Sequence, residues 1–77
     1  MKIVKKINHD SMWIKVVVGV GQFAKLVINR GGVKVQYKGD TKVIADKIID
    51  FWKDTTGTFG DRVDFLEELL ITEYVGR

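Results

Sequence analysis

Lysine residues that alternate with apolar residues are the clearest chemical feature in the first half of this 77-residue chain. Lys15, Lys25, Lys34 and Lys38 share one face of the predicted strands, and Trp13 shares that face with them. An aromatic ring can stack on a nucleobase, while ammonium groups can hold phosphates. Nucleic-acid binding is one interpretation of this face, although sheet-type RNA readers use two or three aromatic residues. The alternatives are that the lysines only keep the sheet soluble, or that a loop or partner covers Trp13.

A glycine motif suggests a different chemistry, because residues 19–24 follow an apolar run and have the pattern G-x-G-x-x-A. In a dinucleotide-binding domain such glycines let the backbone approach a pyrophosphate, and a later acid, here Asp40, would hold the ribose. Residues 22–29 would then have to form the crossover helix. This segment is shorter than the crossovers of such domains, and it contains the β-branched Val27 and Ile28, which favour a strand. We therefore predict a strand that ends in a glycine bulge or hairpin, and no bound cofactor.

The polar residues do not predict a catalytic or metal centre. His9, Asp10 and Ser11 have the residue types of a triad, but consecutive side chains cannot converge on one another, so we predict a polar turn. The chain has one His and no Cys, which leaves no thiolate zinc site and no multi-histidine site within one chain. We expect a protein that is not an enzyme, with no catalytic residues and no metal.

Charge is divided unevenly along the chain. Residues 1–39 contain eight Lys and Arg residues and one acid, whereas residues 40–77 contain five and nine, and the formal net charge is +3. Such a division can steer association with a charged partner, or it can serve solubility alone. The longest strictly apolar runs have three residues, so we expect no membrane-spanning helix, no signal peptide and no membrane partner.

Hydrophobic periodicity predicts an α+β fold, in which a four-stranded antiparallel sheet is followed by two C-terminal helices packed on one face. We expect a single compact domain over 1–77, with a basic sheet half (1–39) and an acidic helical half (40–77). The predicted strands are residues 2–7, 12–20, 23–30 and 33–38, with a turn at Gly31-Gly32. The face predicted to be buried holds Ile14, Val16, Val18, Ala24, Leu26, Ile28, Val33, Val35 and Tyr37. The face predicted to be open holds Trp13, Lys15, Val17, Lys25, Val27, Asn29, Lys34, Gln36 and Lys38.

Capping residues mark where the two helices are expected to begin. Asp40 or Thr41 is predicted to cap the first helix, and Asp61 to cap the second. The second helix also carries Asp64, Glu67 and Glu68 on its outer side. Such exposed carboxylates lack the cleft that acid–base catalysis requires, and they suit a solvated helix start. Alternatively, carboxylates spaced along a rigid surface can occupy a groove built for phosphates, as those of an inhibitor would.

The helical half also resembles a known family. The segments Ile48-Ile49-Asp50-Phe51-Trp52 and Gly57-Thr58-Phe59-Gly60-Asp61-Arg62-Val63 are similar to the C-terminal part of small phage-encoded anti-CRISPR proteins, inhibitors of type I-F CRISPR surveillance complexes. The opening Met1-Lys2-Ile3-Val4-Lys5 resembles the start of that family. The resemblance implies an antiparallel sheet followed by two helices. It also implies a stoichiometric inhibitor that acts in the bacterial host cytoplasm, binding a Cas subunit or guide ribonucleoprotein and blocking target-DNA engagement.

Partner binding of this kind would use a few aromatic anchors together with one of the two charged surfaces. A small nucleic-acid-binding accessory protein remains the alternative, with the open sheet face as its site. The candidate partner-binding residues are Trp13, Lys15, Lys25, Lys34, Tyr37, Lys38, Phe59, Asp64, Glu67 and Glu68.

Overall fold

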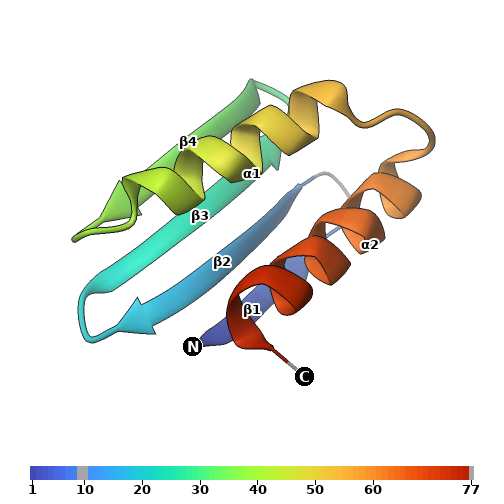
Figure 1. The fold of residues 1–77 in the computed structure, drawn as a ribbon. Coiled ribbons are helices and arrows are strands. Elements are labelled where there is room, and N and C mark those ends of the chain that lie inside the picture. Colours follow the sequence, from blue (N-terminus) through green and yellow to red (C-terminus); the bar gives the residue numbers. More distant parts are fainter. Residues whose placement is uncertain (9–10, 77) are drawn as a thin grey trace.

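The chain folds into a sheet of four strands followed by two helices, which confirms the predicted α+β architecture (Figure 1). The computed structural model describes residues 1–8 and 11–76, so His9 and Asp10 of the predicted polar turn lie outside the described residues. The elements are β1 (Lys2–Ile7), β2 (Met12–Gly19), β3 (Gln22–Asn29), β4 (Gly32–Lys38), α1 (Lys42–Asp54), α2 (Phe59–Leu70) and a π-helical turn, η1 (Ile71–Val75). The strands pair antiparallel in the order β1-β2-β3-β4, so each lies beside its neighbour in sequence.

The glycine motif forms the hairpin between β2 and β3. Gly21 has a φ of 69°, a left-handed conformation that glycine adopts without a steric penalty. Residues 22–29 form a strand that runs antiparallel to β2, so the predicted strand and hairpin are confirmed. A dinucleotide site of this type needs a helix after the glycines, and this segment does not provide one.

The hairpin between β3 and β4 turns one residue earlier than expected. Its two turn residues are Arg30 and Gly31, and β4 begins at Gly32. The side chain of Asn29 sets this turn, because its Oδ1 accepts a hydrogen bond of 2.8 Å from the backbone N–H of Gly31. Such local side-chain bonds are the reason that Asn is favoured in turns.

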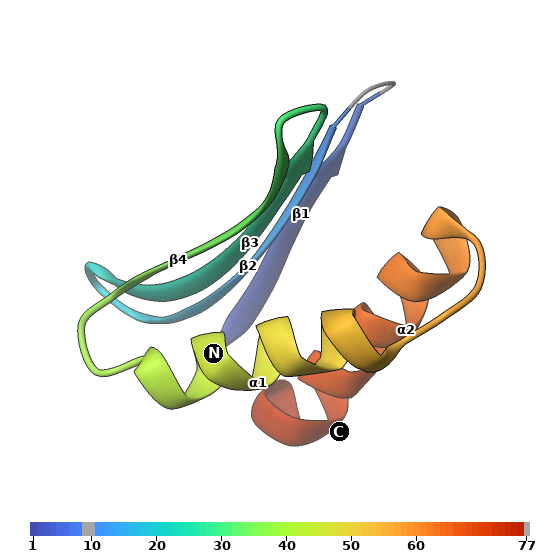
Figure 2. The same ribbon diagram turned by 90° about the horizontal axis from the view of Figure 1, so that it is seen from above.

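Both helices lie on one side of the sheet and enclose the core there (Figure 2). For the central strands the prediction is confirmed at Ile14, Val16, Ala24 and Leu26, which are fully buried against the helices. Val18 and Ile28, nearer the strand ends, are only partly buried. The prediction that Val33 and Tyr37 are buried is wrong, since they are 46% and 49% exposed. They belong to β4, the edge strand, where the cover provided by α1 ends. The buried core consists of Met12, Ile14, Val16, Ala24, Leu26, Ile44, Ala45, Ile48, Trp52, Val63, Leu66 and Leu70.

Thr41 precedes α1 but does not cap it with its side chain. Its hydroxyl, which is buried, instead lies 2.7 Å from the carbonyl oxygen of Phe23 and 3.1 Å from that of Lys38. A hydroxyl has one proton to donate, so the two carbonyls share it. The predicted cap therefore holds the start of α1 against the sheet rather than satisfying the first N–H groups of the helix.

Thr58, not Asp61, caps α2, so that prediction is wrong. The Thr58 side chain accepts a hydrogen bond of 3.2 Å from the backbone N–H of Asp61, and the helix begins at Phe59. Asp61 therefore occupies the third helical position, where its carboxylate interacts favourably with the helix N-terminus.

Arg62 joins the two helices. Its Nη2 donates a hydrogen bond of 2.7 Å to the backbone carbonyl of Trp52, in the last turn of α1. Its guanidinium also lies 4.0 Å from the centroid of the Trp52 ring, and Phe59 meets the same ring edge-on at 6.0 Å. Because the last carbonyls of a helix have no partner within it, this bond satisfies one of them.

Candidate functional site

The sheet face opposite the helices is uncovered and carries the candidate site (Figure 2). Strand pairing arranges its side chains in three rows that run across the sheet. We call this surface the open face. Its rows are Lys6–Trp13–Val27–Lys34, Val4–Lys15–Lys25–Gln36 and Lys2–Val17–Phe23–Lys38. Six of these residues are lysines and none is acidic, so the face is uniformly basic.

Cation–π contacts hold the lysines at the centre of the open face beside two aromatic rings. The Nζ of Lys15 lies 5.7 Å from the centroid of the Trp13 ring and 5.4 Å from that of Phe23. The Nζ of Lys25 lies 4.7 Å from the Trp13 centroid. Lys15 and Lys25 are direct cross-strand partners, and like charges in that position repel each other. The rings offset part of this repulsion.

Two aromatic residues, not one, lie on the open face. Trp13 and Phe23 are two rows apart, which corresponds to about 13 Å along the strands. Sequence reasoning missed Phe23, although the alternation places it opposite the buried Ala24. The faces of β1 do not follow from its sequence, because Ile3 and Ile7 lie on one face and Val4 lies on the other. The pairing of Ile3 with the buried Val16 settles β1 and brings Lys2 and Lys6 to the open face.

A hollow of about 340 Å³ lies at the end of the open face, next to the β3–β4 hairpin. It adjoins Trp13, because Val27 is both part of its lining and the cross-strand partner of that ring. Lys34 and Gln36 line it from β4. The basic face therefore contains a concave subsite with apolar and amide groups.

The structure divides the predicted partner-binding residues between several surfaces. It brings Trp13 together with Lys15, Lys25, Lys34 and Lys38 on the open face. The other candidates lie elsewhere: Tyr37 on the helix side of β4, Phe59 at the start of α2 against Trp52, and Asp64, Glu67 and Glu68 along α2.

Glu67 has a structural contact that the sequence did not suggest. Its Oε1 lies 2.8 Å from the Nζ of Lys5, in an ion pair that joins α2 to β1. Lys5 alternates with Val4 and Lys6, so it projects toward the helices rather than onto the open face. This pair is partly exposed, and such pairs contribute at most about 1 kcal/mol.

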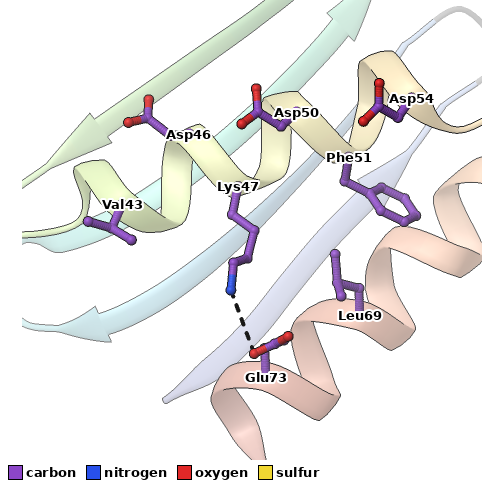
Figure 3. Close-up of a pocket in the computed structure, with 8 residues that line it drawn as sticks. All are labelled: Val43, Asp46, Lys47, Asp50, Phe51, Asp54, Leu69 and Glu73. Atoms are coloured by element: carbon purple, nitrogen blue, oxygen red, sulfur yellow. Dashed lines mark ion pairs between the residues drawn. The ribbon is translucent and has the colours of Figure 1, made fainter.

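A second concavity, of about 450 Å³, lies between α1 on one side and the end of α2 with η1 on the other (Figure 3). Phe51 and Leu69 point toward each other between the helices and give it an apolar surface. Asp46, Asp50 and Asp54 lie along α1 at intervals of four residues. We call this concavity the helix groove. Its lining residues are Val43, Asp46, Lys47, Asp50, Phe51, Asp54, Leu69 and Glu73.

Ion pairs neutralise part of the helix groove. The Nζ of Lys47 reaches to 3.7 Å from a carboxylate oxygen of Glu73, across the groove (Figure 3). Lys42 donates a hydrogen bond of 2.9 Å to Asp46, and this bond raises the pKa of Lys42 above its ordinary value. Asp50 and Asp54 leave an acidic rim beside the apolar surface. The groove and the open face therefore present opposite charges on opposite sides of the sheet.

Within residues 1–8 and 11–76, no group of three His, Asp or Glu side chains lies close enough together to hold a metal ion. Neither helix has the length and apolar character needed to cross a membrane. No protein family model, no curated protein and no solved structure matches the chain.

Proposed function

We propose that the protein binds single-stranded nucleic acid through its open face. The observation that supports this most is that six lysines and two aromatic rings share a sheet face that no helix covers and that has no acid in its rows. Lysines that neutralise phosphates release condensed counterions, which drives binding. The rings offer stacking surfaces that every base can use.

The width of the sheet favours a single strand over a duplex. Neighbouring strands are about 4.8 Å apart, so β1 and β4 are separated by about 14 Å. The major groove of DNA is only about 12 Å wide. In addition, only unpaired bases expose their faces to rings such as Trp13 and Phe23. We expect DNA or RNA single strands to bind more tightly than a duplex of the same sequence.

Fluorescence anisotropy with end-labelled single strands, at a series of NaCl concentrations, tests this function. The logarithm of the binding constant should fall linearly with that of the salt concentration, with a slope as steep as about −4 if all six lysines hold phosphates. Lys25→Glu with Lys38→Glu should weaken binding strongly. Lys42→Glu with Lys53→Glu makes the same change of net charge on α1 and should have little effect. An equal loss of affinity in the two double variants, or no binding of single strands at low salt, would overturn the proposal.

The helix groove supports a second candidate function, in line with the resemblance to type I-F inhibitors. We propose that it binds a basic surface of a Cas subunit or guide ribonucleoprotein. Asp46, Asp50 and Asp54 follow one another about 6 Å apart along the axis of α1. Carboxylates in such a row can occupy positions built for phosphates, and the apolar surface of Phe51 and Leu69 beside them can anchor a partner side chain.

A pull-down with the tagged protein, from a host that carries a type I-F system, tests the second function. Mass spectrometry should identify Cas subunits whose recovery resists nuclease treatment. Asp50→Lys with Asp54→Lys should abolish that recovery, whereas Lys25→Glu with Lys38→Glu should leave it unchanged. If no Cas subunit is recovered, or if its recovery depends on intact nucleic acid, the inhibitor function is wrong.

A further inference from the structure

The hollow beside the β3–β4 hairpin differs from the rest of the open face in its shape and in its chemistry. The rows of lysines form an extended surface, whereas the hollow is an open concavity with a volume of about 340 Å³. This volume is at the lower end of the range for small-molecule sites, so it suits one small planar group rather than a whole nucleotide chain. Its lining residues are Val27, Asn29, Gly31, Gly32, Val33, Lys34 and Gln36.

The hairpin gives the hollow a fixed wall. The bond from the Gly31 N–H to Asn29 Oδ1 ties the turn, and it leaves the amide nitrogen of Asn29 with its donors. Gly32 has a φ of 124°, and a Cβ added there would have nothing within 4 Å. The backbone at this position is therefore open to a ligand, and a residue other than glycine would be strained.

The polar groups of the hollow can recognise a base edge and its phosphate. The carboxamide of Gln36 is exposed and makes no hydrogen bond within the described residues. A carboxamide presents a donor beside an acceptor, the pattern that matches N6 and N7 of adenine. Lys34 lies two residues earlier on the same strand, so its ammonium is on the same face as Gln36 and can hold a neighbouring phosphate.

We propose that this hollow holds one unpaired nucleobase, with a preference for adenine. The base would pack on Val27 next to the Trp13 ring, bond through its edge to Gln36, and have its phosphate on Lys34. This inference rests on the proposed single-strand binding and adds base selectivity to it. It assigns the two ends of the open face different roles, because the row of Phe23 lies at the opposite end of the face, where it offers a stacking ring and lysines but no carboxamide that could read a base edge.

Competition between strands that differ at one position tests the base site. The probes are labelled oligothymidylates with and without one central adenine, and the corresponding oligouridylates of RNA. Wild-type protein should bind the adenine-containing strand at least about fivefold more tightly. Gln36→Ala should bring this ratio close to one without changing the salt slope. Gln22→Ala, which removes the same group at the start of β3, should leave the ratio unchanged.

Lys34→Ala separates the phosphate contact from base recognition. It should reduce the magnitude of the salt slope by about 0.7 while preserving the adenine preference. Tight binding of all strands with equal affinity would overturn the base site and leave single-strand binding intact. Failure to bind any strand at low salt would overturn both. A preference for adenine that survives Gln36→Ala would also overturn the assignment of the edge contact.

Discussion

Lys15 lies between the two aromatic rings of the open face and contacts both of them. Its ammonium covers ring surface that a nucleobase would use, so it must move toward a phosphate when a base stacks. The flexible stem of lysine allows this movement. Ring and cation are therefore expected to act together, and their substitutions to be non-additive.

Removal of either ring is expected to weaken single-strand binding. Stacking contributes about 1–3 kcal/mol per base, so Trp13→Ala and Phe23→Ala should each raise the dissociation constant by about 5- to 150-fold. Fluorescence anisotropy at a fixed salt concentration measures this change. Tyr37→Ala provides the control, because that ring is more exposed than either of them but lies on the helix side of the sheet. If Tyr37→Ala weakens binding as much, the open face is not the binding surface.

Thr41 offers a prediction about stability rather than binding. Thr41→Val replaces its buried hydroxyl by a methyl group of similar size and removes the donor to Phe23 and Lys38. The free energy of unfolding should fall by about 1–2 kcal/mol, measured by urea denaturation. Thr56→Val makes the same change at an exposed position and should have almost no effect. Similar results for the two variants would mean that the hydroxyl does not hold α1 to the sheet.

Among the elements, the strands could be predicted from the sequence, but the start of α2 could not. Alternation along residues 12–38 gives the two faces of the strands, and the short connections favour antiparallel neighbours, which gives the strand order. The predicted cap of α2, Asp61, was wrong because Thr58, three residues earlier, is also a good cap and is the one that the structure uses. The bond from the Asp61 N–H to the Thr58 side chain distinguishes the two caps in the structure, and residue types three positions apart do not reveal it.

The candidate site was predictable only in part, for a similar reason. The lysines of β2 to β4 follow from the alternation, but Lys2 and Lys6 depend on the register of β1 against β2. Ile3, Val4 and Ile7 leave that register open, because they do not all lie on one face. The helix groove depends on how α1 packs beside α2, and the sequence pattern of a single helix does not predict that packing.

Arg62 is expected to stabilise the connection between α1 and α2. Arg62→Met keeps an apolar stem over Trp52 but removes the hydrogen bond to its carbonyl, so we expect a loss of about 1.5–3 kcal/mol of unfolding free energy. Urea denaturation followed by circular dichroism measures it. Arg62→Lys retains the charge and should recover only part of the loss, because an ammonium lacks the planar guanidinium. Full stability of Arg62→Met would contradict this role.

The molecule as a whole is electrically polar, because the lysines lie on the open sheet face and the carboxylates of the helix groove (Figure 3) lie on the helix side. A polyanion approaching at random is therefore oriented before contact, with the open face toward it. The same field disfavours binding of an acidic partner to the helix side. The two proposed functions thus use different surfaces, and variants of one surface can be tested without changing the other.

Added NaCl is expected to stabilise the ligand-free protein. It screens the repulsion between the lysines of the open face, which is strongest for the opposed pair Lys15 and Lys25. The melting temperature should rise with NaCl, and it should rise less in Lys25→Gln, which removes one charge of the pair. Lys53→Gln on α1 serves as the control. A wild-type melting temperature that falls with NaCl would show that attraction elsewhere dominates.

Trp13 and Trp52, the two tryptophans of the chain, lie in different surroundings and thereby provide two optical reporters. Trp52 is 5% exposed beneath the guanidinium of Arg62, so its emission should report unfolding. Trp13 lies among ammonium groups on the open face. The field of those groups attracts anions and repels cations, so iodide should quench Trp13 more efficiently than caesium does. Trp13→Phe then leaves the signal of Trp52 alone, and the difference between the two spectra isolates the emission from the open face.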